Sequence, residues 1–204
     1  MLPAALMLLA AQDPETAVDA ERAFNRAAQT HGQWTAFREF MTDDAIVFTP
    51  QPTKAKEALP EKNPPVAVQW WPAESYVSCD GTMAVNTGPW VRPRGVGYFT
   101  TVWVRQADGH FKWVYDGGDA LTAPRALPEK PKVVRASCKP QTAFNDVYYA
   151  LSSQEVARGA GSSPDDTLHW EWSVGSDGSR VFVVVLWNGH DYEIVLRDQV
   201  AAPK

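Results

Sequence analysis

The sequence predicts an α+β fold in which N-terminal helices are followed by a curved antiparallel sheet that wraps around them. Two observations carry this prediction. Apolar residues recur at helical spacing up to about residue 41, and β-rich runs separated by turn signals follow from Val66. Helices followed by a run of strands are typical of α+β proteins. A further group of β-rich runs predicts a C-terminal β-meander extension over residues 136–204.

The first helix is expected to follow the N-cap Asp13, with Pro14 in its first turn, and to stop at Gly32. A second short helix comes next and is expected to be closed by Thr42–Asp44. Both helices carry their apolar residues on one face, which is typical of helices that cover a core. These residues are Ala20, Phe24, Ala27 and His31 in the first helix, and Trp34, Phe37, Phe40 and Met41 in the second.

A short strand is predicted at Ala45–Thr49, ending at Pro50, and residues 51–65 are predicted to form a loop with one helical turn around Lys54–Leu59. An antiparallel meander is expected next, because turn signals at Cys79–Gly81 and Ala107–Gly109 separate β-rich runs. Its strands are predicted at Val66–Trp71, Tyr76–Cys79, Met83–Val91, Tyr98–Gln106 and Phe111–Asp116.

A Pro-rich linker is predicted over residues 123–135, between a first domain at 13–122 and the extension at 136–204. Turn signals at Asp177-Gly178 and Asn188-Gly189 divide the extension into hairpins. Its run Val181–Leu186 is continuously apolar, which predicts a strand covered on both faces. The strands are expected at Leu168–Val174, Arg180–Trp187 and Tyr192–Leu196.

The composition excludes some classes of protein. The net charge of -5 and the pI of about 5.4 argue against binding to nucleic acid, whose phosphates an acidic chain repels. The four histidines do not stand at metal-ligand spacing, so no metal site is predicted. No dinucleotide fingerprint, phosphate loop or nucleophile elbow is present, and no cofactor is predicted.

The first 12 residues are largely apolar and too short to span a bilayer as a helix. They are typical of a secretory signal peptide, although a basic n-region is missing; a buried N-terminal helix turn is the alternative. A signal peptide implies a periplasmic or secreted protein whose mature chain begins near Gln12 or Asp13. In that compartment Cys79 and Cys138 can form a disulfide, the alternative being two unrelated core thiols.

Two stretches resemble the nuclear transport factor 2-like superfamily, which includes ketosteroid isomerases and SnoaL-like polyketide cyclases. The first runs from Glu21-Arg22-Ala23-Phe24 to Phe40 and on to Pro50, and the second joins Asn86–Trp90 to Thr101–Trp113. The nearest similarity is to exported bacterial members of unknown function, and it covers about residues 15–122. The resemblance implies a cone-shaped bent sheet with a pocket at its open end. It does not imply one function, since the superfamily includes enzymes, binding domains and assembly modules.

Candidate site residues follow from placing the chain in such a cone. The resemblance puts the general base of the isomerases at Thr49, a residue whose hydroxyl is a poor base. Asp43 and Asp44 lie near it and are interpreted as a solvated helix end. Asp116 and Asp119 flank Gly117-Gly118, where they either stabilise a turn or face the pocket. The predicted ligand-binding residues are Thr49, Trp90, Trp103, Trp113 and Tyr115, with Tyr76 and Tyr98 as further candidates.

The sequence leaves three functions open. The favoured one is binding of a small apolar or amphipathic molecule in the cone without catalysis. The second is an isomerase, cyclase or hydratase, which a buried carboxylate with a raised pKa would favour. The third is a homodimer or other interaction module that uses the outer face of the sheet, unless the C-terminal extension covers that face.

Overall fold

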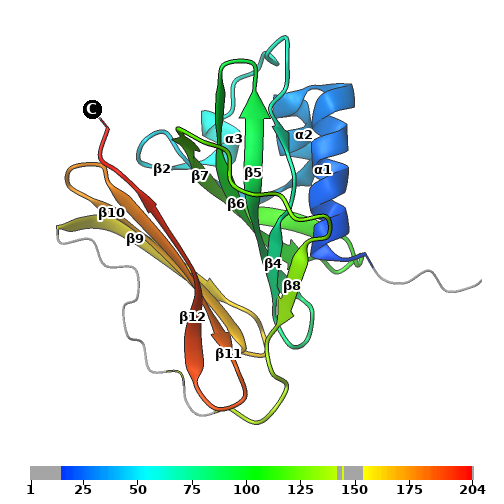
Figure 1. Ribbon diagram of the computed structural model, residues 1–204, viewed down its shortest axis with the longest axis vertical. Coiled ribbons are helices and arrows are strands. Elements are labelled where there is room, and N and C mark those ends of the chain that lie inside the picture. The colour runs from blue at the N-terminus through cyan, green and yellow to red at the C-terminus, as the bar shows by residue number, and fades with distance from the viewer. Residues whose placement is uncertain (1–14, 142–143, 145–153, 204) are drawn as a thin grey trace, which may run out of the picture.

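Three helices and twelve strands form three layers in the computed structural model, which describes residues 15–141, 144 and 154–203 (Figure 1). Helices cover one face of an eight-stranded sheet, and a separate four-stranded sheet lies against the other face. The predicted α+β class is therefore confirmed. The apolar segment at residues 1–12, which was interpreted as a signal peptide, lies outside the described residues.

The helices begin and end at recognisable capping residues. Helix α1 (Ala17–His31) starts later than predicted, because Thr16 and not Asp13 is its N-cap and forms a capping box with Asp19. It ends at Gly32, whose φ of +98° suits glycine. Helix α2 follows at Gln33–Phe40, and the one-turn helix α3 (Ala55–Ala58) lies in the predicted loop.

The large sheet contains the predicted antiparallel meander, β4 to β7. Two parallel pairings extend it: β1 joins β7, and β8 joins β4. The order is β2-β1-β7-β6-β5-β4-β8, with β3 paired to β5. The strands are β1 (Met41–Phe48), β2 (Pro52–Lys54), β3 (Gln69–Trp70), β4 (Glu74–Val77), β5 (Met83–Arg92), β6 (Gly95–Arg105), β7 (Phe111–Leu121) and β8 (Lys132–Arg135).

Two segments in this region differ from what the sequence indicated. Thr42–Asp44 do not close the second helix but belong to β1, where Asp43 and Asp44 are exposed. The linker predicted at 123–135 contains strand β8, because the backbone of Lys132–Arg135 pairs with the edge strand β4. Neither the exposed acids nor the mixed run at Lys132–Arg135 has the alternating apolar pattern of a half-buried strand.

The C-terminal sheet has the order β12-β11-β10-β9, all antiparallel. Its strands are β9 (Glu155–Ser162), β10 (Leu168–Gly175), β11 (Arg180–Trp187) and β12 (Tyr192–Val200). The three strands expected from sequence are confirmed, whereas β9 was not predicted. Phe182–Trp187 of β11 are all buried, as their continuous apolar run predicted.

One hydrophobic core lies in each of the two spaces between the three layers. The first lies between α1, α2 and the large sheet, and includes Phe24, Trp103 and Trp113, all fully buried. The second joins the opposite face of the large sheet to the C-terminal sheet, with Tyr115 and Trp172 among its members. The C-terminal sheet thus covers the face that the sequence analysis offered to a second copy of the chain.

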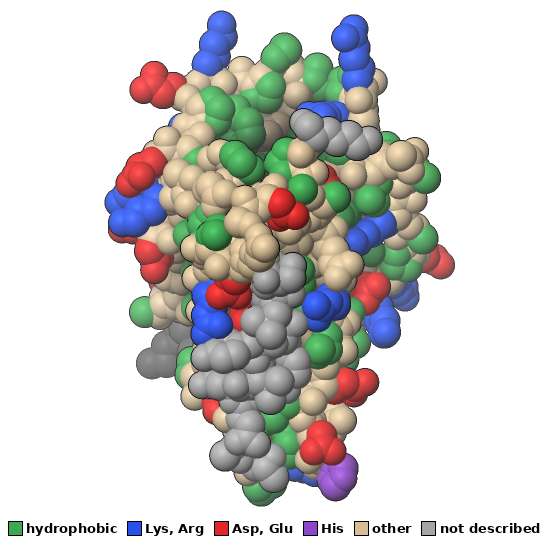
Figure 2. All heavy atoms as spheres, turned by 90° about the vertical axis from the view of Figure 1, so that its left-hand side faces the viewer, with side chains coloured by type: hydrophobic (Ala, Val, Ile, Leu, Met, Phe, Trp, Pro, Cys, Tyr) green, Lys and Arg blue, Asp and Glu red, His purple; other side chains and the backbone are tan. Residues whose placement is uncertain are grey.

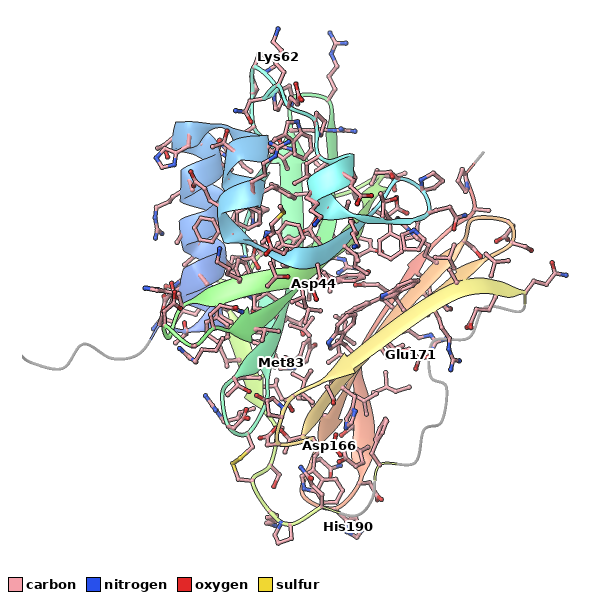
Figure 3. All side chains as sticks on the ribbon, turned by 180° about the vertical axis from the view of Figure 1, so that it is seen from behind. Asp44, Lys62, Met83, Asp166, Glu171 and His190 are labelled. Atoms are coloured by element: carbon pink, nitrogen blue, oxygen red, sulfur yellow. A yellow bond between two sulfur atoms is a disulfide. The ribbon has the colours of Figure 1, made fainter. Side chains whose placement is uncertain are left out.

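Covalent and polar contacts fix the C-terminal sheet in place. Cys79 and Cys138 form a disulfide with a Cα–Cα distance of 5.2 Å, which confirms the pairing that the sequence left open (Figure 3). At the far end of the same interface, Asp198 of β12 is 5% exposed and accepts hydrogen bonds from Thr100 and Arg125. Within the described ranges no helix has the length and apolar character needed to cross a membrane.

Candidate functional site

A cavity of about 560 Å³ opens between the helices and the large sheet, at the end of the sheet where β1 leaves β7. The last paired residues of these two strands are Ile46 and Tyr115. Beyond them the strands diverge, and both sides of the gap become cavity wall. The lining residues are Gln33, Trp34, Phe37, Val47, Phe48, Thr49, Ala58, Leu59, Pro60, Val68, Trp70, Trp90, Arg92, Tyr98, Phe99, Asp116, Gly117, Gly118, Asp119, Ala120 and Arg180.

Seven of the 21 lining residues of this cavity are aromatic. Hydrogen bonds hold two of their indoles in place. Trp70 Nε1 donates to Glu21 Oε1 at 2.8 Å, and Trp90 Nε1 donates to the carbonyl oxygen of Tyr98 at 3.0 Å. With both N–H groups occupied by the protein, the two rings present apolar surface to a ligand. A cavity of this size with aromatic walls is typical of a small-molecule site.

Asp116 is the carboxyl group that faces this aromatic wall. It is cross-strand from Thr101, whose Oγ1 donates to Asp116 Oδ2 at 3.0 Å. Burial raises the pKa of Asp116 to about 7, and the hydrogen bond from Thr101 opposes that rise. The group is therefore divided between its acid and base forms near neutral pH, and it can accept or release a proton there.

A second acidic residue, Glu21, lies behind the wall and is fully buried. Its carboxyl group accepts hydrogen bonds from Trp70, Trp103 (2.6 Å) and Asn86 (3.2 Å). Burial raises the pKa of Glu21 to about 8, although these three donors lower it and the charge of Asp116 raises it further. Because Glu21 does not line the cavity, its role is to position Trp70.

Arg180 reaches the cavity from the C-terminal sheet. Its guanidinium lies over the Phe48 ring, with Cζ 4.7 Å from the ring centroid, and Nη2 donates to the carbonyl oxygen of Gly118 at 3.3 Å. Position 118 requires glycine for a different reason, since a Cβ there would lie 2.1 Å from the carbonyl oxygen of Tyr98 on the neighbouring strand β6. The cavity is therefore built from both sheets and not from residues 13–122 alone.

The structure places two of the five predicted ligand-binding residues in the cavity. Thr49 lies at its exposed rim, with Oγ1 3.2 Å from Thr53 Oγ1, and Trp90 forms part of its wall. Trp103, Trp113 and Tyr115 are not among the lining residues. The first two are fully buried beneath Phe24, and Tyr115 lies in the core between the two sheets.

A β-bulge explains why Tyr115 lies on the other face of the sheet from Trp113. Val102 pairs with Tyr115 but Trp103 pairs with Trp113, so Val114 is an extra residue in β7. An extra residue interrupts the alternation of side chains and turns those that follow to the opposite face. The bulge therefore removes Tyr115 from the helix side and brings Asp116 onto it.

The other acidic and phenolic candidates also divide into residues that line the cavity and residues that do not. Asp116 and Asp119 both line the cavity, and they do not flank a turn, because β7 continues through Gly117-Gly118 to Leu121. Asp44 lies outside the cavity on β1 and accepts a hydrogen bond from Thr42 at 2.8 Å (Figure 3). Of the two further phenols, Tyr98 lines the cavity and Tyr76 belongs to the core between the sheets.

Arg180 is a charged residue of the site that the sequence analysis missed. It was read only as the first residue of a strand in a separate extension. Its position in the sequence could have indicated it, because a charged residue directly before the apolar run Val181–Leu186 lies where a core strand reaches the edge of the hydrophobic core. Trp34 and Phe37 were assigned to a helix face but not to a site, and both line the cavity.

In the described part of the chain, no group of three or more His, Cys, Asp and Glu side chains is placed so that it could hold a metal ion. His190 illustrates why, since it lies exposed at the tip of the turn between β11 and β12 (Figure 3). Figure 2 shows acidic and basic side chains interspersed on the face that carries the C-terminal sheet.

Comparison of the chain with models of known protein families gives no match, and comparison with curated proteins gives none either.

Proposed function

We propose that this protein binds a small amphipathic molecule in the cavity between its helices and the large sheet. The observation that carries the proposal is the cavity itself, about 560 Å³ with an aromatic wall and a few polar groups. Flat apolar ligands bind such walls through area burial and stacking. Thr49 at the rim is unsuited to act as a base, which supports binding without the chemistry of the isomerases.

We further propose that residues 13–122 form a cone-shaped domain of the nuclear transport factor 2-like superfamily, and that the protein works in the periplasm or outside the cell. The order of two helices followed by an antiparallel meander supports the first proposal. The disulfide between Cys79 and Cys138 supports the second, since such bonds persist in oxidising compartments. A homodimer remains an alternative partner arrangement that would need a surface other than the covered face.

The test of binding is a calorimetric titration with flat steroid-like and polyketide-like molecules. Trp90→Ala should weaken the affinity about tenfold, because it removes a buried aromatic contact. Trp187→Phe is the matched control, since Trp187 is buried in the C-terminal sheet away from the cavity. An absence of binding for the whole panel, together with no retained ligand in native mass spectrometry of protein from its own host, would reject the proposal.

Proton transfer is the second candidate function, and Asp116 is the observation that favours it. A carboxyl group with a pKa near 7 in a largely apolar cavity is suited to remove a proton next to a carbonyl group. Turnover of a β,γ-unsaturated ketone that disappears in Asp116→Asn would establish this activity. Binding of the ketone without turnover would restrict the protein to the first function.

A further inference from the structure

Arg180 lines the cavity, and no carboxylate of residues 15–141 or 154–203 lies within ion-pair distance of it. A guanidinium has five N–H donors, and in Arg180 one of them is used, in the 3.3 Å hydrogen bond to the Gly118 carbonyl oxygen. Among the residues that the structure describes, none forms an ion pair with Arg180. Its stacking on the Phe48 ring fixes the plane of the guanidinium and leaves its edge available.

Tyr98 supplies a second unused donor at the same end of the cavity. Its side chain is 3% exposed, and its hydroxyl has no hydrogen-bond partner in the described ranges. A niche of about 10 Å³ adjoins the cavity here and shares Phe48, Tyr98, Gly118 and Arg180 with it. Asp198 also lines this niche, and its carboxylate is ion-paired with Arg125 at 2.9 Å. Arg125 covers the face of the Tyr98 ring, with Cζ 3.6 Å from the centroid, so the Tyr98 hydroxyl and the remaining Arg180 donors are the groups left to pair at this end of the cavity.

We propose that this end of the cavity binds the anionic group, a carboxylate or a phosphate, of an amphipathic ligand whose flat body lies against the aromatic wall. Arg180 would hold that group with charge-assisted hydrogen bonds, and the Tyr98 hydroxyl would donate one more. The inference rests on the proposed binding function and narrows it to a class of ligand. It also gives the C-terminal sheet a role, because that sheet supplies the charge that selects the ligand.

The acidic residues of the cavity are compatible with this assignment. Asp116 accepts its hydrogen bond from Thr101, and Asp119 Oδ1 accepts one from the backbone N–H of Ala120 at 2.7 Å. Since the pKa of Asp116 is raised to about 7, that group is partly protonated at neutral pH. Arg92, which lies over the Trp90 ring with Cζ 5.3 Å from the centroid, adds a second positive charge at the rim. Two arginines, Arg92 and Arg180, thus share the cavity with two aspartates, and the carboxylate of Asp198 in the adjoining niche is paired with Arg125.

The test compares a matched pair of probes, 2-naphthoate and its neutral isostere 2-naphthamide, by isothermal titration calorimetry. The wild-type protein should bind 2-naphthoate at least about tenfold more tightly than 2-naphthamide. Arg180→Met keeps the length of the side chain and removes its charge, so it should abolish this preference while changing the affinity for 2-naphthamide less than about twofold. Arg22→Met, at an exposed position on α1, is the control and should retain the preference.

Tyr98→Phe provides a second variant that does not depend on the fold tolerating a change at Arg180. Because the Tyr98 hydroxyl has no partner within the described residues, its removal should leave the stability unchanged or higher. It should weaken 2-naphthoate several-fold and leave 2-naphthamide unaffected. 2-Naphthyl phosphate, titrated in parallel, shows which anion fits better, and tighter binding of either anion than of the amide supports the proposal.

Two results separate the failure of this inference from the failure of the proposed function. Equal affinities of the wild-type protein for 2-naphthoate and 2-naphthamide would overturn the inference and leave the binding function standing. Preference for the anions that survives both Arg180→Met and Tyr98→Phe would overturn it as well. Failure of the wild-type protein to bind any of the three naphthalene probes or the steroid-like panel would reject both proposals.

Discussion

At the scale of single residues, two carboxyl groups on the helix side of the large sheet make the stability depend on pH. Burial raises the pKa of Glu21 from 4.5 to about 8 and that of Asp116 from 3.8 to about 7. Between the ordinary and the raised values, the folded protein holds protons that the unfolded chain has released. The free energy of unfolding therefore falls as the pH rises from about 4 to about 8, by at most about 1.4 kcal/mol per pH unit for each group.

Replacing Glu21 should remove its share of this dependence. Glu21→Gln should be less stable than the wild type at pH 5 by about 1–3 kcal/mol. The reason is that the N–H groups of the new amide would point at the N–H groups that now donate hydrogen bonds to the carboxyl group of Glu21. The difference in the free energy of unfolding should narrow toward pH 9, because ionisation of the buried Glu21 destabilises the wild type there. Urea unfolding at several pH values measures both curves. Parallel curves would contradict the raised pKa, and Glu61→Gln, at an exposed position, is the control.

What could be predicted about the site was limited by the face on which each side chain lies. Trp90 was expected on the wall because it lies on a strand of the expected cone, and it lines the cavity. Tyr115 was expected in the cavity because its strand was expected to form the wall, but the extra residue Val114 places Tyr115 on the opposite face from Trp113. A single bulge leaves no clear trace in a run of β-formers, so Asp116 could be named as a candidate but not placed on the correct face.

At the scale of elements, strand β9 depends on residues that lack side chains. Gly159 and Gly161 are cross-strand from Trp172 and Trp170, and the indole rings occupy the space that two Cβ atoms would need. A Cβ at Gly159 would lie 2.6 Å from the Trp172 ring. The side chains of β10 therefore fill the space on this face of both strands, and at these two positions β9 can pair with β10 because it has no side chains of its own there.

This packing predicts a large effect from a small substitution. Gly159→Ala should lower the free energy of unfolding by about 1–3 kcal/mol, because the added methyl group must displace a tightly packed indole. Ala160→Ser is the control, since Ala160 is exposed on the opposite face of the same strand. Thermal unfolding of both variants measures the difference. Equal melting temperatures for Gly159→Ala and the wild type would show that the Trp172 ring can move.

The same feature explains which strands were foreseen. Strands β5, β6, β10 and β11 are rich in β-branched and aromatic residues, and all four were predicted close to their observed bounds. Strand β9 contains glycine and alanine where a strand signal is expected, and β8 is a short exposed run. Their partners, and not their own composition, hold these two in the sheets. Tertiary pairing of this kind cannot be read from local sequence.

At the scale of the whole molecule, the two sheets are held together at both ends of their interface. The disulfide and the hydrogen bonds from Cys79 N to Thr167 Oγ1 (2.8 Å) and from Asp80 N to Asp165 Oδ2 (2.7 Å) fix one end. The ion pair of the partly exposed Arg125 with the buried Asp198 (2.9 Å) fixes the other. Between them lies the second hydrophobic core, so the cavity keeps Arg180 only while this interface is intact.

Removing the disulfide should therefore weaken the whole chain. Its cysteines are 59 residues apart, and the loop-entropy model gives a loss of about 4 kcal/mol for a loop of that length. The double variant Cys79→Ser, Cys138→Ser should show this loss in urea unfolding, as should wild-type protein treated with a reductant. Reductant should leave the double variant unchanged, which is the control. Equal midpoints for oxidised and reduced wild type would show that the bond does not constrain the unfolded chain.

The position of this bond has a consequence for the order in which the molecule is made. Both cysteines precede residue 139, whereas every strand of the C-terminal sheet follows residue 154. A chain emerging from its N-terminus can thus close the bond before any of those strands exists. The large sheet would then serve as a template on which the later hairpins assemble, with their starting point already fastened beside Cys79. Arg180 of β11 would therefore reach the cavity only after the bond has closed, so the proposed anion selectivity would arise late in the folding of a new chain.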